Sequence, residues 1–151
     1  MRSAPSYRAQ VSALILLVDD NSDGIMARRC VLEELGYNVV PASSGAEALR
    51  IAEQQNFDLV VTDYKMSPMN GLELIRHLRE RKFENPIILL SGFADNLGLN
   101  SENSGADFVI QKSANEVSAL VRHAKRLLTP KKPAGSQKSN KPRAQSAKTD
   151  S

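Results

Sequence analysis

Short runs of consecutive apolar residues alternate along the chain with longer segments in which apolar residues recur at a helical spacing. The runs are rich in Val, Ile and Leu, which is typical of strands buried on both faces of a parallel sheet. They lie at Leu14–Val18, Tyr37–Ala42, Leu59–Thr62, Ile87–Leu90 and Phe108–Gln111. The pattern therefore predicts five strands.

Helical segments follow these runs. The expected helices cover about Gly24–Leu35, Gly45–Gln55, Leu72–Arg81 and Val117–Leu128. Ser22 is suited to cap the first of these, and Ser43 or Ser44 the second. A helix within residues 95–104 is only weakly encoded, because that segment is polar and contains Gly98. Strand and helix thus alternate five times, which predicts an α/β domain with a parallel sheet covered by helices on both faces.

The first expected helix has one apolar stripe and ends at Gly36. The stripe consists of Ile25, Val31, Leu32 and Leu35. Arg28 and Glu34 are expected to point away from it. Cys30 lies near the stripe, and ordinary packing is a better interpretation of this residue than a reactive thiol.

Composition sets the limits of the domain. The chain has 151 residues, of which 41% are hydrophobic and 25% charged, and this fits one domain of residues 12–128 after a loose lead-in of residues 1–11. Residues 129–151 contain six Lys and Arg residues and one Asp, so they account for more than the whole net charge of +3. They are predicted to form a disordered basic tail. The tail could bind nucleic acid weakly, but a solubilising extension is the preferred interpretation.

The cysteine count and the hydropathy pattern indicate a compartment. Cys30 is the single cysteine, so a disulfide within the chain is excluded, and a reducing cytoplasmic location fits best. The apolar stretch Ala13–Val18 is too short to span a bilayer and has no cleavage pattern after it. Neither export nor membrane insertion is expected.

Polar residues follow four of the predicted strands, and these are the candidate functional residues. They are Asp19, Asp20, Asp63, Ser91 and Lys112. The carboxyl ends of parallel strands are where open α/β sheets bind ligands, so these groups are expected to converge in one crevice. Clustered carboxylates repel one another unless a cation lies among them, and Mg²⁺ prefers such oxygen ligands. A carboxylate can also be a nucleophile toward phosphorus, with Lys112 and Ser91 contacting the phosphoryl oxygens.

The residues resemble the receiver domain of two-component response regulators. The resemblance runs from about Leu14 to Leu128, and it covers Val18-Asp19-Asp20, Asp63 with Gly71 eight residues on, Ser91-Gly92, and Gly105-Ala106-Asp107 leading to Lys112. It implies a flavodoxin-like (βα)5 doubly wound sheet with strand order 2-1-3-4-5.

The same resemblance implies roles for these residues. Asp63 would be the phosphoacceptor, and Ser91 and Lys112 would hold the phosphoryl group. Asp20, Asp63 and the backbone carbonyl of Lys65 would bind Mg²⁺ directly, with Asp19 acting through water. The donor would be a phosphohistidine on a histidine kinase or histidine phosphotransfer protein. The chain would be a stand-alone switch for a downstream target that the sequence does not identify, and it would not be an enzyme beyond slow autodephosphorylation.

Three positions depart from the usual pattern of that family. Val109 occupies the position that is usually aromatic, and Phe108, one place earlier, should point to the opposite face. Ser113 stands where proline is usual after Lys112, so a trans peptide bond is expected there. Ser67 occupies another usual proline position, with Pro68 one later. Lys65, at a position where the family varies, places a cation beside Asp63.

Two alternatives to the switch are less well supported by the residues. A degenerate receiver that binds proteins without phosphorylation is conceivable because of Val109 and Ser113, although the intact acidic set argues against it. A hydrolase with an Asp nucleophile would need a second general acid and a covering element, and neither is evident.

Overall fold

The computed structural model describes residues 12–92 and 98–129, and it contains one five-stranded sheet. The strands are β1 (Leu14–Val18), β2 (Asn38–Ala42), β3 (Leu59–Asp63), β4 (Ile87–Ser91) and β5 (Phe108–Gln111). All neighbouring strands pair in parallel, in the order β2-β1-β3-β4-β5. The flavodoxin-like topology with strand order 2-1-3-4-5 is therefore confirmed.

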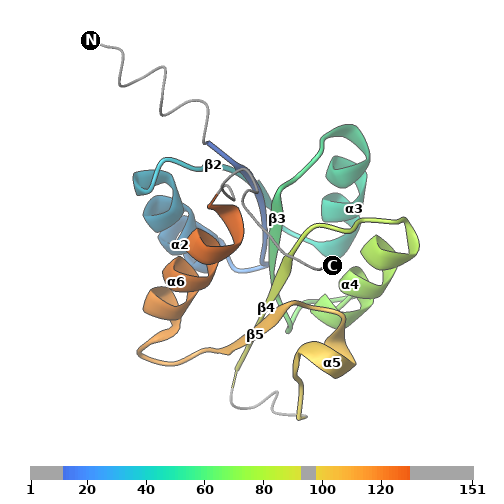
Figure 1. Cartoon of the computed structure of the whole chain (residues 1–151). Coiled ribbons are helices and arrows are strands. Elements are labelled where there is room, and N and C mark those ends of the chain that lie inside the picture. The colour runs from blue at the N-terminus through green and yellow to red at the C-terminus, as the bar shows by residue number, and fades with distance from the viewer. Residues whose placement is uncertain (1–11, 93–97, 130–151) are drawn as a thin grey trace, which may run out of the picture.

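Helices cover both faces of the sheet. They are α2 (Ser22–Glu34), α3 (Gly45–Gln54), α4 (Gly71–Glu80), α5 (Ser101–Ser104) and α6 (Glu116–Leu128). In Figure 1, α2 and α6 lie on one side of the sheet, and α3, α4 and α5 lie on the other. The weakly encoded fourth helix is a single short turn, which ends at Gly105 with a φ of 81°.

Alternation along each strand builds two separate aliphatic cores. Leu16 and Val18 of β1 pack with the side chains of α3 and α4, whereas Ile15 and Leu17 pack with Leu32 of α2 and with α6. The same alternation continues through β3, β4 and β5. Successive strand residues point to opposite faces, so residue parity decides which pair of helices each residue meets.

The helix ends agree with most of the predicted signals. Ser44 caps α3, because its hydroxyl accepts a hydrogen bond from the Glu47 amide at 3.1 Å. The predicted cap of the first helix was wrong: the cap is Asn21, whose side chain accepts from the Gly24 amide at 3.0 Å. Asn21 has the extended backbone that a cap needs, and Ser22 is already helical.

The prediction that Cys30 packs near the apolar stripe of α2 was also wrong, since Cys30 is exposed. The buried residues of α2 are Arg28 and Leu32. Cys30 is two positions from each of them, which places it about 200° around the helix, on the far side. Arg28, expected to point away, lies on the buried side instead.

Several expectations lie outside the described residues. These are the loose lead-in of residues 1–11 and, beyond Thr129, the basic tail. Within residues 12–92 and 98–129, no helix has the length and apolar character needed to cross a membrane.

Candidate functional site

Asp19 and Asp63 lie side by side at the carboxyl end of the sheet. β1 and β3 are neighbours, and Val18 pairs with Thr62, so the next residue of each strand is a carboxylate. The two residues are only 2% and 3% exposed. By parity they share the face of the sheet that carries Leu17 and Val61, which is the face covered by α2 and α6.

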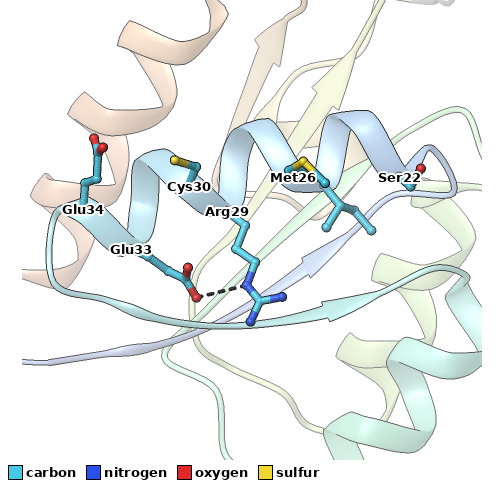
Figure 2. Close-up of a pocket in the computed structure, with 7 residues that line it drawn as sticks. Ser22, Met26, Arg29, Cys30, Glu33 and Glu34 are labelled. Atoms are coloured by element: carbon cyan, nitrogen blue, oxygen red, sulfur yellow. Dashed lines mark hydrogen bonds and ion pairs between the residues drawn. The ribbon is translucent and has the colours of Figure 1, made fainter.

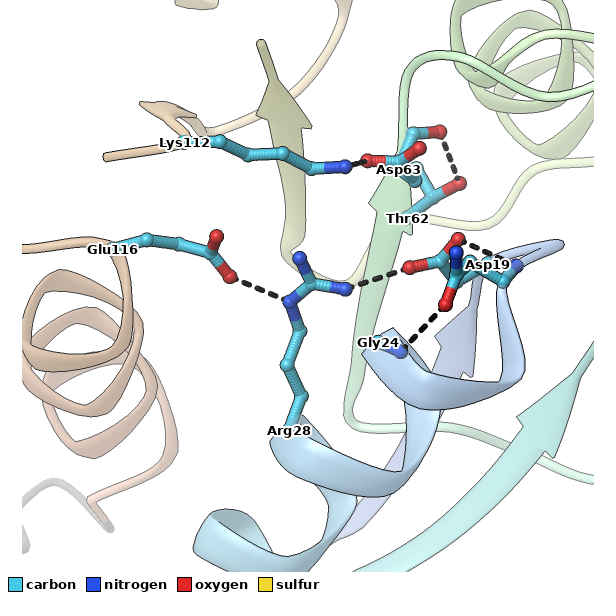
Figure 3. Close-up of polar contacts among 8 residues, drawn as sticks. Asp19, Gly24, Arg28, Thr62, Asp63, Lys112 and Glu116 are labelled. Atoms are coloured by element: carbon cyan, nitrogen blue, oxygen red, sulfur yellow. Dashed lines mark hydrogen bonds and ion pairs between the residues drawn. The ribbon is translucent and has the colours of Figure 1, made fainter. Parts of the chain in front are cut away.

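Lys112 reaches Asp63 from the far edge of the sheet. It follows β5, and its amide donates to the Ser91 carbonyl at 2.8 Å. Its ammonium forms an ion pair with Oδ1 of Asp63, as Figure 3 shows. Apart from Lys112, no group within the described ranges donates to this oxygen. The predicted convergence of Asp63 and Lys112 is therefore present.

Burial controls the charge state of Asp63. Loss of hydration raises the pKa of its carboxyl above the ordinary aspartate value, and the Lys112 ammonium opposes this rise. Asp19 raises the pKa further by repulsion, and the Arg28 guanidinium lowers it. A carboxylate in this position favours the approach of further positive charge, because each added cation stabilises its ionised form.

Ser91 lies on the other face. Its parity matches Ile87 and Leu89, which pack on the α3 and α4 side. The residue is buried and lines a cavity of about 150 Å³ with Leu99, Val109 and Gln111. Its backbone is close to Lys112, but none of the contacts among the described residues joins its hydroxyl to Asp63 or Lys112.

Asp20 and Lys65 are exposed at the rim of the site. Within residues 12–92 and 98–129, no three His, Cys, Asp or Glu side chains are grouped closely enough to hold a metal ion. The donor chemistry nevertheless fits Mg²⁺, because Asp19 and Asp63 provide buried carboxylates on adjacent strands and Asp20 is free to join from solvent. Asp19, however, already accepts hydrogen bonds at both oxygens, from the Asn21 amide and from Arg28.

The loop after β3 packs tightly against the backbone of Asp63 and Tyr64. The Gly71 amide donates to the Tyr64 carbonyl at 2.8 Å. A Cβ atom at residue 71 would lie 2.4 Å from the carbonyl oxygen of Asp63 and 2.9 Å from both Leu89 Cδ1 and Tyr64 Cα. Only glycine fits here, which explains the spacing of eight residues between Asp63 and Gly71.

Sequence reasoning missed Arg28 and Glu116. Arg28 donates to Asp19 Oδ2 at 2.7 Å through NH1 and to Glu116 Oε2 at 2.5 Å through Nε. It thereby connects β1 to the first turn of α6 across the carboxyl end of the sheet. The partners are 9 and 88 residues away in sequence, so no local pattern signalled the contacts.

The structure shows how the chain packs at Phe108 and Val109 and which peptide bond precedes Ser113. Phe108 packs with the α2 and α6 core and Val109 with the opposite core, as their parity predicts. Phe108 stacks on His123 of α6 with ring centroids 4.0 Å apart. The bond before Ser113 is trans as predicted, and a cis bond occurs between Ser67 and Pro68.

A larger hollow of about 490 Å³ lies away from the acidic site, on the exposed side of α2. Figure 2 shows Met26, Cys30 and the Arg29–Glu33 ion pair along this side of the helix. None of the predicted functional residues lines it. Its position on a helix surface separates it from the carboxyl ends of the strands.

Comparison with known proteins gives the family. The response regulator receiver domain matches residues 15–124, which includes β2 to β5, all of β1 except Leu14, and the whole acidic site. The chain belongs to the response regulator receiver domain family. Members of this family are switches in two-component signalling rather than enzymes with their own substrate turnover, and they interact with histidine kinases and downstream targets.

Curated relatives of this receiver include a transcriptional regulator and a sensor kinase. The alkaline phosphatase synthesis transcriptional regulatory protein PhoP of Bacillus subtilis is 38% identical over 114 residues, which are 72% of this chain and 46% of PhoP. The CAI-1 autoinducer sensor kinase/phosphatase CqsS of Vibrio cholerae is 34% identical over 118 residues, 75% of this chain and 17% of CqsS. The receiver thus spans less than half the length of these relatives.

Solved structures agree with the fold. The response regulator TrrA of Thermotoga maritima, in complex with Mg²⁺-BeF, has a TM-score of 0.68 and 34% identity, covering 77% of this chain and 99% of TrrA. The Francisella response regulator 1452 receiver domain has a TM-score of 0.70 and 27% identity, covering 78% of this chain and 97% of that domain.

Proposed function

We propose that this receiver accepts a phosphoryl group on Asp63 and signals by a conformational change. The observation that carries the proposal is the pairing of a buried carboxylate at the end of β3 with the Lys112 ammonium. This ion pair places a cation beside the oxygen that would attack phosphorus. Asp19, one strand away, supplies a second carboxylate for the metal site.

The transfer step follows from the chemistry of the groups. An oxygen of the ionised Asp63 attacks phosphorus of a phosphohistidine, an acyl phosphate bond forms, and the P–N bond breaks with its electron pair remaining on the imidazole. Lys112 moves from the carboxylate to a phosphoryl oxygen, and Ser91 donates to another after its loop shifts. Mg²⁺ held by Asp19, Asp20, Asp63 and the Lys65 carbonyl would neutralise the charge on the transferring group.

A histidine kinase or histidine phosphotransfer protein is the proposed donor, and a downstream protein the proposed target. Support comes from the family and from the sensor kinase CqsS, a relative that contains a matching segment. The proposed domain comprises residues 12–128, with residues 1–11 and 129–151 as extensions. A cytoplasmic location remains a prediction from the single cysteine.

The test is phosphorylation by acetyl phosphate with Mg²⁺, read by mass spectrometry of the intact protein. We expect the wild-type chain to gain one phosphoryl group and Asp63→Asn to gain none. Asp23→Asn, which removes an exposed carboxylate of α2, is the matched control and should behave as the wild type. Absence of phosphoryl gain in the wild type would instead favour the degenerate binding module.

A further inference from the structure

A buried arginine occupies the acidic site. Arg28 projects from α2 and is only 7% exposed. Figure 3 shows its guanidinium between two carboxylates, with Asp19 on one side and Glu116 of α6 on the other. Both contacts are charge-assisted hydrogen bonds within ion pairs.

The Arg28–Asp19 ion pair provides a hydrogen-bond donor and a positive charge for the carboxylate that would otherwise face the metal. Oδ2 of Asp19 accepts from Arg28 at 2.7 Å, and Oδ1 accepts from the Asn21 amide at 3.0 Å. A buried carboxylate without such partners would be strongly destabilising. The guanidinium therefore supplies, without a metal, the positive charge that this part of the site requires.

The surrounding backbone is shaped to admit this ion pair. A Cβ atom at Gly24 would lie 2.5 Å from Asp19 Oδ2 and 2.9 Å from Arg28 NH1. The first turn of α2 thus leaves room for the pair only because residue 24 has no side chain. This is a second observation, independent of the hydrogen bonds, that the ion pair belongs to the fold.

We propose that Arg28 is a built-in competitor of the divalent cation at Asp19 and that Glu116 holds it when the cation binds. The inference rests on the proposed function, since it concerns the proposed magnesium site. A guanidinium and Mg²⁺ repel each other, and both draw on the Asp19 carboxylate. Cation binding must therefore weaken the Arg28–Asp19 contact, and the contact with Glu116 keeps the displaced guanidinium paired.

The experiment measures the Mg²⁺ dissociation constant of the full chain by isothermal titration calorimetry, without a phosphoryl donor. We expect Arg28→Met to bind Mg²⁺ at least about tenfold more tightly than the wild type, the size of change that one charge-assisted hydrogen bond produces. Arg29→Met is the matched control, because Arg29 is adjacent but exposed and pairs with Glu33. It should leave the dissociation constant within about twofold.

Glu116→Gln tests whether Glu116 holds the displaced Arg28. This variant can be measured even if Arg28→Met does not fold. Without the carboxylate at 116, displacement of Arg28 is more costly, so Mg²⁺ binding should weaken by about threefold or more. The same substitution in the Arg28→Met background should have no effect, because there is no guanidinium to hold. A general electrostatic effect of Glu116 would persist in that background.

The outcomes separate this inference from the proposed function. If the wild type accepts a phosphoryl group and Arg28→Met binds Mg²⁺ no more tightly than Arg29→Met, the inference is wrong and the function stands. If Glu116→Gln has equal effects with and without Arg28, the role of Glu116 as the alternative partner is refuted. If neither the wild type nor Arg28→Met binds Mg²⁺, the inference fails together with the metal site. Binding by Arg28→Met alone would support the inference most strongly.

Discussion

Replacing Gly71 with alanine tests how closely the β3–α4 loop packs against Asp63. The added Cβ would lie 2.4 Å from the Asp63 carbonyl oxygen, whereas real Cβ atoms essentially never approach within 3.0 Å of another heavy atom. The obstacle is the backbone of β3 and not a flexible side-chain end. The loop or the end of the strand must therefore move by at least about 0.6 Å.

The magnitude follows from two contributions. Overpacking of this kind costs about 1–3 kcal/mol. The hydrogen bond from the Gly71 amide to the Tyr64 carbonyl, 2.8 Å long, contributes about 0.5–1.5 kcal/mol and is weakened by the same movement. We expect Gly71→Ala to lower the free energy of unfolding by about 2–4 kcal/mol. Displacement of Asp63 should also slow phosphoryl gain from acetyl phosphate.

Gly45→Ala is the matched control. Both glycines are the first residue of their helix, and neither has a positive φ. The Cβ at residue 45 would meet the sulfur of Met69 at 2.6 Å and Cγ and Cβ of the same side chain at 3.1 and 3.2 Å, so a partly buried methionine side chain, and not the backbone of a strand, must shift. Urea unfolding should therefore give a change within about 1 kcal/mol for this variant. Equal stability of the two variants, with normal phosphoryl gain in Gly71→Ala, would refute the steric argument.

Three further predictions concern charge and packing. Lys112→Met should raise the pKa of Asp63 further, because the cation that offsets the effect of burial is lost. Phosphoryl gain should also slow at least about tenfold, and a normal rate in stopped-flow acetyl phosphate assays would contradict this. Burial lowers the pKa of His123, so the unfolded chain binds a proton at this residue more readily than the folded chain does. The free energy of unfolding should therefore fall as the pH drops below about 6.5. In His123→Phe, which keeps the stack on Phe108, the melting temperature should depend less on pH in that range. Leu74→Ala should cost about 2–5 kcal/mol in urea unfolding, since Leu74 is fully buried on the inner face of α4; a cost below about 1 kcal/mol would show that the core repacks.

The fold and the pairing of Asp63 with Lys112 could be predicted because both depend on local signals. Continuous apolar runs indicate parallel strands, and the residue that ends each run must lie at the carboxyl edge of the sheet. Asp19, Asp63 and Lys112 do lie at that edge, on one face of the sheet. The end of an apolar run does not by itself distinguish the two faces, so Ser91 was expected to join the same cluster, although its parity directs it toward Val109.

The contacts of Arg28 could not be predicted in this way. The apolar stripe of α2 suggested an outward position, because a stripe counts only apolar residues. A long side chain with an apolar stem can lie along the buried face and carry its charge to the end of the helix. Its partners, Asp19 and Glu116, belong to elements that meet only in the folded sheet. Gly24, one turn before Arg28, was the available local signal, since it leaves the space that the pair needs.

Residue parity also determines which helices lie closest to the charge of Asp63. Asp19, Asp63 and Lys112 share the face covered by α2 and α6, and those two helices contribute Arg28 and Glu116. Coulomb interactions fall with distance, so negative charge added at Asp63 acts first on the cations of that face. On the other face Ser91 lines a cavity with Leu99, Val109 and Gln111. Asp19 therefore contacts α2 through Arg28, and Arg28 in turn contacts α6 through Glu116.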